Sequence, residues 1–144
     1  MYFESGGARM YYERRGTAGA PLVLLHGWGG NADSMAPLAR DFEKARRVLA
    51  ADFPGHGKSP EPPEPWEVTE YMELLRRLLE KEGFAGADVV AHSFGGRVSI
   101  LLAAKHPEMT KRLLLTGCAG IPNRPSNQLS AKTRAYQALR GMAD

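Results

Sequence analysis

The feature that most constrains the fold is the alternation of short apolar runs with longer segments whose apolar residues recur at helical spacing. The runs lie at residues 21–25, 48–52, 88–92 and 113–115, and each is apolar over most of its length. Such runs are typical of strands that are buried on both faces of a parallel sheet. Strands that alternate with helical segments indicate an α/β fold with crossover helices. We therefore predict a mostly parallel sheet covered by helices.

Two aromatic-rich stretches, residues 2–5 and 9–13, precede the first run and are separated by Gly6 and Gly7. Glycine adopts the positive φ that a tight hairpin turn requires. The pattern predicts a short antiparallel hairpin at the N-terminus.

The first helix is expected after the run at 21–25, with Asp33 or Ser34 as its N-cap. Its buried face is expected to carry Met35, Leu38, Ala39 and Phe42. Prolines occur repeatedly up to Pro65, so a second helix should begin near Trp66, and Gly83 should end it.

Two further helices are expected in the C-terminal part of the chain. One should begin directly after Ser93 and end at residues 106–107, where a proline follows a histidine. The other is an amphipathic segment at residues 129–142.

Composition limits the class of protein. The chain has 144 residues, 43% of them hydrophobic and 24% charged, which indicates one soluble globular domain and excludes disorder as its main state. Basic and acidic residues alternate and leave a net charge of only +3, so we expect no nucleic-acid partner. No run is apolar enough to span a membrane. Cys118 is the only cysteine, which favours a reducing, cytoplasmic location.

The segment most informative about chemistry is Ala-His-Ser-Phe-Gly-Gly at residues 91–96. It joins a predicted strand to a predicted helix, so a sharp turn there would present the Ser93 hydroxyl above the strand ends. Small residues at Ala91 and Gly95 let strand and helix approach closely. The backbone N–H of Phe94 begins the helix, which makes it a candidate oxyanion donor.

A second oxyanion donor is expected from the glycine-rich loop at residues 26–30. Its glycines would allow the Trp28 N–H to face the same point as the Phe94 N–H.

Three segments together resemble the α/β-hydrolase fold family: the His-Gly-Trp loop that contains Trp28, the Asp-Phe-Pro-Gly-His-Gly-Lys-Ser segment at 52–59, and the turn around Ser93. The resemblance implies that Ser93 is a nucleophile that forms an acyl-enzyme, with Trp28 and Phe94 as the oxyanion donors. It further implies a small hydrophobic, ester-like substrate and no cofactor.

None of the four histidines is expected to act as the catalytic base. His26 and His56 lie in glycine-rich turns, where they would hold the turns by hydrogen bonds. The side chain of His92 should point away from the adjacent serine, and His106 lies at the far end of the following helix. No histidine recurs at helical ligand spacing, so we expect no metal site.

In the family, the catalytic acid and histidine follow the serine on later strands. We expect both to be missing here, because the resemblance covers only the N-terminal half of the family fold. Residues 1–120 would form the N-terminal part of a core that lacks the last two strands, and residues 121–144 would begin a lid. The chain alone should be nearly inactive.

Two alternatives to a serine esterase remain open. One is a non-catalytic binding or oligomerisation module that kept the fold. The other is one half of a split hydrolase. Under every one of these readings the apolar strand at residues 113–115, around Leu113 and Leu115, would be an exposed edge, through which we expect a homodimer or a complementary C-terminal chain to associate.

Overall fold

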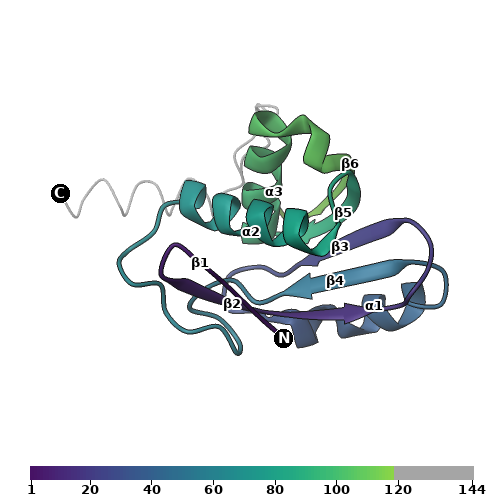
Figure 1. Cartoon of the computed structure of the whole chain (residues 1–144), viewed down its shortest axis with the longest axis horizontal. Helices are drawn as coiled ribbons and strands as arrows, with labels where there is room; N and C mark the ends of the chain where they lie inside the picture. Colours follow the sequence, from purple (N-terminus) through teal and green to yellow (C-terminus); the bar gives the residue numbers. More distant parts are fainter. Residues whose placement is uncertain (119–144) are drawn as a thin grey trace, which may run out of the picture.

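The computed structural model describes residues 1–118, which form a six-stranded mixed sheet with helices on both faces (Figure 1). The strands lie in the order β1-β2-β4-β3-β5-β6. Their bounds are β1 Tyr2–Ser5, β2 Ala8–Arg15, β3 Pro21–Leu25, β4 Arg47–Ala51, β5 Ala87–His92 and β6 Thr110–Thr116. The first two strands form the predicted antiparallel hairpin, and β4, β3, β5 and β6 run parallel to one another. The predicted α/β fold is confirmed.

The helices are η1 (Ala32–Met35), α1 (Ala36–Phe42), α2 (Val68–Glu82), α3 (Phe94–Lys105) and η2 (Pro107–Met109). In Figure 1, α2 and α3 lie together on one face of the sheet, and α1 lies on the other. All the regular elements predicted within the described residues are present.

The two faces of the sheet build two separate cores, because alternate residues of each central strand point to opposite faces. Val23 and Leu25 of β3 belong to the larger core beneath α2 and α3. Leu22 and Leu24 of the same strand belong to a smaller core beneath η1 and α1. All four are almost fully buried, as expected of a strand covered on both sides.

The first helix differs from the prediction in its cap and in its buried face. The cap is Asn31, whose side-chain oxygen accepts the Ser34 N–H at 3.1 Å, and the first turn is a 3-10 helix. Leu38 and Phe42 were expected to be buried but are 38% and 39% exposed, because α1 covers the sheet only over β3 and β4.

The second helix begins two residues later than predicted. Its N-cap is Glu67, whose N–H donates to the Glu70 carboxylate at 2.9 Å, so Trp66 stays outside the helix. Gly83 ends the helix with φ of +71°, as predicted.

Residues 119–144 lie outside the described residues, and with them the predicted helix at 129–142 and the predicted lid segment. Among the helices of residues 1–118, none is both long and apolar enough to cross a membrane. The cytoplasmic location and the division at residue 120 stay predictions.

Candidate active site

Ser93 occupies a strained turn between β5 and α3. Its φ of 48° and ψ of −109° make it the one non-glycine residue with positive φ in the described part of the chain. Such a conformation costs about 1–3 kcal/mol and persists only where its surroundings hold it. Here the Ser93 N–H donates to the Thr116 carbonyl at 2.9 Å, and the Ser93 carbonyl accepts the Gly96 N–H at 3.0 Å. The turn predicted around Ser93 is therefore present.

Gly95 fixes the start of α3 against the end of β3. A Cβ at Gly95 would lie 2.7 Å from the His26 carbonyl oxygen and 2.8 Å from the Leu25 Cβ, so no larger residue fits without a shift. At this close approach the Gly95 N–H donates to the His26 carbonyl at 3.1 Å. The small side chain of Ala91, completely buried, serves the same close packing on the strand side.

The loop that carries Trp28 lies against Ser93. The Gly30 N–H donates to the Gly27 carbonyl at 2.9 Å, and Gly29 has φ of +74°, as the third residue of a type II turn requires. A Cβ at Gly27 would lie 3.0 Å from the Ser93 Cβ. The structure thus brings the Trp28 loop into contact with the serine.

Trp28 and Phe94, the two predicted oxyanion donors, flank Ser93 from separate elements. Their rings meet edge to face, with centroids 5.3 Å apart. Within residues 1–118, neither backbone N–H of this pair donates a hydrogen bond to a protein acceptor. Both donors are therefore available to an oxygen of a bound molecule.

His26 holds the two loops together. Its Nε2 accepts the Phe53 N–H at 3.0 Å, so the proton of the neutral ring lies on Nδ1 and is donated to the Gly27 carbonyl at 2.7 Å. Burial lowers the pKa of His26, which favours this neutral form. The side chain is 1% exposed and has a structural role, as the sequence predicted.

Asp52 organises the segment at 52–59, a role that sequence reasoning did not assign. Its buried carboxylate accepts the Lys58 N–H at 2.7 Å and the Ala32 N–H. Gly57, with φ of +54°, leaves the space that this carboxylate fills. The signal available in the sequence was an aspartate at a strand end followed by glycines.

The other three histidines have partners other than Ser93 among the described residues. His92 Nδ1 lies 3.1 Å from the Thr116 hydroxyl, and His106 lies 3.4 Å from the Glu73 carboxylate. His56 Nδ1 lies 3.2 Å from the Pro54 carbonyl. No histidine of residues 1–118 forms a hydrogen bond with the Ser93 hydroxyl. No cluster of three potential metal ligands occurs in the same residues.

An aromatic wall continues from the loop to α2. The Trp28 ring contacts His56 at a centroid distance of 4.7 Å, and the Phe94 ring contacts Phe53 at 5.3 Å and Tyr71 at 5.1 Å. Trp28 is 69% exposed, whereas the other rings of the wall are buried. Phe53 and Tyr71 were not identified from the sequence as neighbours of the site, because only the fold brings their segments together.

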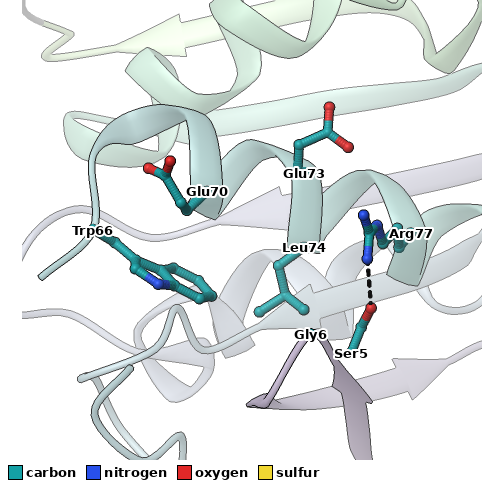
Figure 2. A pocket seen from close by; sticks show the side chains of 7 residues that line it. All are labelled: Ser5, Gly6, Trp66, Glu70, Glu73, Leu74 and Arg77. Carbon is teal, nitrogen blue, oxygen red and sulfur yellow. Dashed lines mark hydrogen bonds between the residues drawn. The ribbon is translucent and has the colours of Figure 1, made fainter. Parts of the chain in front are cut away.

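Away from these loops, a hollow of about 140 Å³ lies between the hairpin and α2 (Figure 2). It is lined by Ser5, Gly6, Trp66, Glu70, Glu73, Leu74 and Arg77. Figure 2 shows the Arg77 guanidinium donating to the Ser5 hydroxyl, at 3.0 Å. Glu70 is already engaged in capping its helix and Glu73 in pairing with Arg76. The hollow is therefore a seam between two elements and holds no catalytic set.

Comparison with known proteins gives consistent results. The α/β hydrolase fold family matches residues 20–139. The acetyltransferase component of the acetoin cleaving system of Pseudomonas putida is 35% identical over 82% of this chain and 32% of its own length. Lipase 1 of Psychrobacter immobilis is 36% identical over 81% of this chain and 37% of its own.

Solved structures agree with the sequence matches. The enol-lactonase of Burkholderia xenovorans LB400 superposes with a TM-score of 0.78 and 27% identity, over 83% of this chain and 47% of its own. The chain thus spans less than half the length of these three relatives. The match over most of the chain confirms the resemblance seen in the three segments, and the chain belongs to the α/β-hydrolase fold family.

Proposed function

We propose that this chain is the nucleophile-bearing part of a serine hydrolase that cleaves carboxylic esters through an acyl-enzyme on Ser93. The observation that carries the proposal is the strained serine, held between two loops whose Trp28 and Phe94 N–H groups have no protein acceptor within residues 1–118. Lipases and other hydrolases among the family relatives support it.

In the proposed reaction, the Ser93 oxygen attacks the ester carbonyl carbon and its proton passes to a base. The carbonyl oxygen gains negative charge, which the Trp28 and Phe94 N–H groups stabilise. Collapse of this intermediate breaks the bond to the alcohol, which takes the proton and leaves. Water then attacks the acyl-serine by the same route and releases the acid.

The substrate class follows from the walls of the site. The Trp28 and Phe94 rings meet edge to face beside Ser93, and the Phe94 ring packs in the same way against Phe53 and Tyr71. A small hydrophobic acyl group would bury apolar surface against these rings. We therefore propose small, hydrophobic esters as substrates.

The described residues contain no base for Ser93, so we expect this chain alone to be nearly inactive in turnover. Removal of the base and acid from such a site leaves only the residual acceleration of the oxyanion hole and binding, about 10³–10⁴-fold over water. The same observation favours a second candidate function, a non-catalytic binding module that kept the fold.

Labelling with an alkyl fluorophosphonate, followed by intact-mass spectrometry, tests the two candidates. The esterase proposal expects one adduct, formed faster than on the urea-unfolded chain and absent in Ser93→Ala. Ser5→Ala, on the hairpin, is the matched control and should label like the parent. Equal labelling of folded and unfolded chain, or an unchanged adduct in Ser93→Ala, would support the non-catalytic module.

A further inference from the structure

The Tyr71 hydroxyl is a polar group that the proposed reaction does not use. The side chain is 6% exposed, and its ring meets Phe53, Trp66 and Phe94 edge to face, which holds it in one orientation. The hydroxyl makes no hydrogen bond with any other group of residues 1–118. The one fully enclosed side-chain polar atom without a partner in these residues belongs to Thr110, so the Tyr71 oxygen is open to a molecule from outside. Buried hydroxyls normally have a partner, which indicates that a bound molecule supplies one.

The Glu61 carboxylate lies beside this hydroxyl. Burial and the negative charge of Glu61 together raise the pKa of Tyr71, which places the carboxylate close to the phenol oxygen. The Gly55 N–H donates to the Pro60 carbonyl at 2.9 Å and holds the next residue, Glu61, against the turn. The two carboxylate oxygens lie 3.1 and 3.7 Å from the position that a Cβ at Gly55 would take. Within residues 1–118, Glu61 forms neither an ion pair nor a hydrogen bond.

Two sets of contacts connect Tyr71 and Glu61 to the candidate active site. Phe94, which follows the serine, meets the Tyr71 ring at a centroid distance of 5.1 Å. On the other side, His56 directly follows the glycine against which Glu61 rests, and its ring meets Trp28 at 4.7 Å. The Trp28 and Phe94 rings close the circuit at 5.3 Å. The Tyr71 hydroxyl and the Glu61 carboxylate therefore border the same aromatic wall as the oxyanion donors.

The loop between β4 and α2 carries negative charge (Figure 1). It follows the carboxyl end of β4, and Ser93 follows the carboxyl end of the parallel strand β5, so both lie at one edge of the sheet. Residues 59–75 contain five glutamates and no lysine, arginine or histidine. Lys58, just before this segment, pairs with Glu13 on β2 at 3.7 Å. Such a rim of one sign attracts ligands of the opposite charge.

The chemistry of the two groups limits what they can bind. A carboxylate accepts hydrogen bonds and a phenol oxygen can also accept one, so a ligand common to both must be a donor. A primary ammonium has three N–H donors and the charge that complements Glu61. A hydroxyl matches the hydrogen bonds but lacks the charge. A metal ion needs more ligands, and no group of three potential metal-ligating side chains occurs in residues 1–118.

We propose that Glu61 and the Tyr71 hydroxyl bind a primary ammonium group of the substrate, beyond Phe94 on the aromatic wall. The substrate would then be an ester whose hydrophobic acyl chain crosses Phe94 and ends in a protonated amine. This inference rests on the proposed function, because it narrows the esters that Ser93 would cleave.

Isothermal titration calorimetry with hexylammonium chloride and 1-hexanol tests the proposal on the 144-residue chain. The two ligands share a six-carbon chain and differ in the charge of the end group. We expect hexylammonium to bind at least about fivefold more tightly than 1-hexanol at low salt, and this preference should shrink at high salt. Ser93→Ala should bind hexylammonium with the affinity of the parent, because the ammonium does not contact the serine.

Paired variants locate the binding. Glu61→Gln should remove the preference for hexylammonium, whereas Glu64→Gln, an exposed carboxylate of the same loop, should retain it. Tyr71→Phe keeps the ring and removes the hydroxyl. It should weaken hexylammonium binding about threefold and leave the urea midpoint unchanged, since the hydroxyl has no partner in the described part of the chain. Circular dichroism verifies that each variant folds.

Equal affinities of the parent for the two ligands, or equal losses in Glu61→Gln and Glu64→Gln, would overturn the proposal. A lower urea midpoint in Tyr71→Phe would do so too, because the hydroxyl would then have a partner within the protein. If 1-hexanol loses as much affinity as hexylammonium in Tyr71→Phe, the ligand is a hydroxyl and the proposal is wrong.

Protection of the serine relates the ammonium site to the reaction. Saturating hexylammonium should slow fluorophosphonate labelling of Ser93 in the parent, and in Glu61→Gln it should not at the same concentration. Binding without this protection would separate the site from the substrate. The calorimetric affinities do not depend on a reactive serine, so a chain that binds hexylammonium but does not label would contradict the esterase proposal alone.

Discussion

The Gly95 N–H donates a hydrogen bond to the His26 carbonyl at 3.1 Å, which joins the first turn of α3 to the loop that follows β3. This contact aligns two elements that are 69 positions apart in the chain. It exists only because residue 95 has no side chain, since a Cβ would lie 2.7 Å from that carbonyl oxygen.

Gly95→Ala should therefore separate the serine turn from the oxyanion loop. We expect a loss of about 1–3 kcal/mol in the free energy of unfolding by urea, as for overpacking elsewhere in a core. We also expect slower fluorophosphonate labelling of Ser93.

Gly83→Ala is the matched control for Gly95→Ala. Gly83 has φ of +71° with no atom near its missing Cβ, so the substitution strains only the helix end. Gly83→Ala should lower the free energy of unfolding by about 1 kcal/mol and leave the rate of Ser93 labelling unchanged. Equal labelling rates in the two variants would show that the Gly95 contact does not position the serine.

Much of the fold and the turn around Ser93 were predictable from the sequence, because both depend on local patterns. Continuous apolar runs identified β3 and β5, and the small residues around Ser93 identified the turn. The N-cap at Asn31 was missed because Asn31, Asp33 and Ser34 are all good caps. Which of the three caps the helix depends on where the chain leaves the preceding loop. The hydrogen bond from the Ala32 N–H to the Asp52 carboxylate fixes that point directly after Asn31.

Features that depend on contacts between distant segments were not predictable in this way. Leu38 has the spacing of a buried helical residue, yet its exposure follows from how far α1 extends across the sheet. Tyr71 was recognised as part of an apolar helical face, and only the packing of α2 against α3 brings it to Phe94.

His26 should make stability depend on pH. Burial lowers its pKa in the folded chain, whereas the unfolded chain titrates near pH 6.5. The stabilisation from neutral His26 is therefore complete above about pH 6.5 and is lost as the pH falls towards the lowered folded value. Urea unfolding at pH 7.5 and at lower pH should show that the free energy of unfolding declines as the pH falls. The decline should be smaller in His26→Ala.

His26→Ala should also destabilise the protein by about 1–3 kcal/mol at pH 7.5, because the buried Phe53 N–H loses its acceptor. His92→Gln changes an exposed histidine and is the control. If the free energies of unfolding of the parent and of His26→Ala decline equally with falling pH, another group is responsible for the pH dependence.

Asp52→Ala should disrupt the 52–59 segment while leaving β4 intact. The Lys58 and Ala32 N–H groups would both lose their acceptor. Each buried N–H left without an acceptor should lower the free energy of unfolding by about 1–3 kcal/mol. Urea unfolding measures the loss. Asp33→Ala, which removes an exposed carboxylate nearby, should change the free energy of unfolding by no more than about 0.5 kcal/mol.

Trp28 offers a test that separates its backbone from its side chain. If its N–H stabilises the oxyanion, Trp28→Ala keeps that donor and removes only the exposed indole beside Phe94. Labelling by a fluorophosphonate with a short alkyl chain should then change little. Labelling by a long-chain analogue should slow about tenfold, since its alkyl group loses apolar contact.

Trp66→Ala is the control for Trp28→Ala, because the Trp66 ring meets Tyr71 edge to face and borders the hollow between the hairpin and α2. It should affect neither probe. Equal slowing of the short and long probes in Trp28→Ala would instead indicate that the indole holds the loop in place, and that the acyl group lies elsewhere. A selective loss of the long-chain probe would place the acyl group along the aromatic wall, on the face of the sheet that α2 and α3 cover.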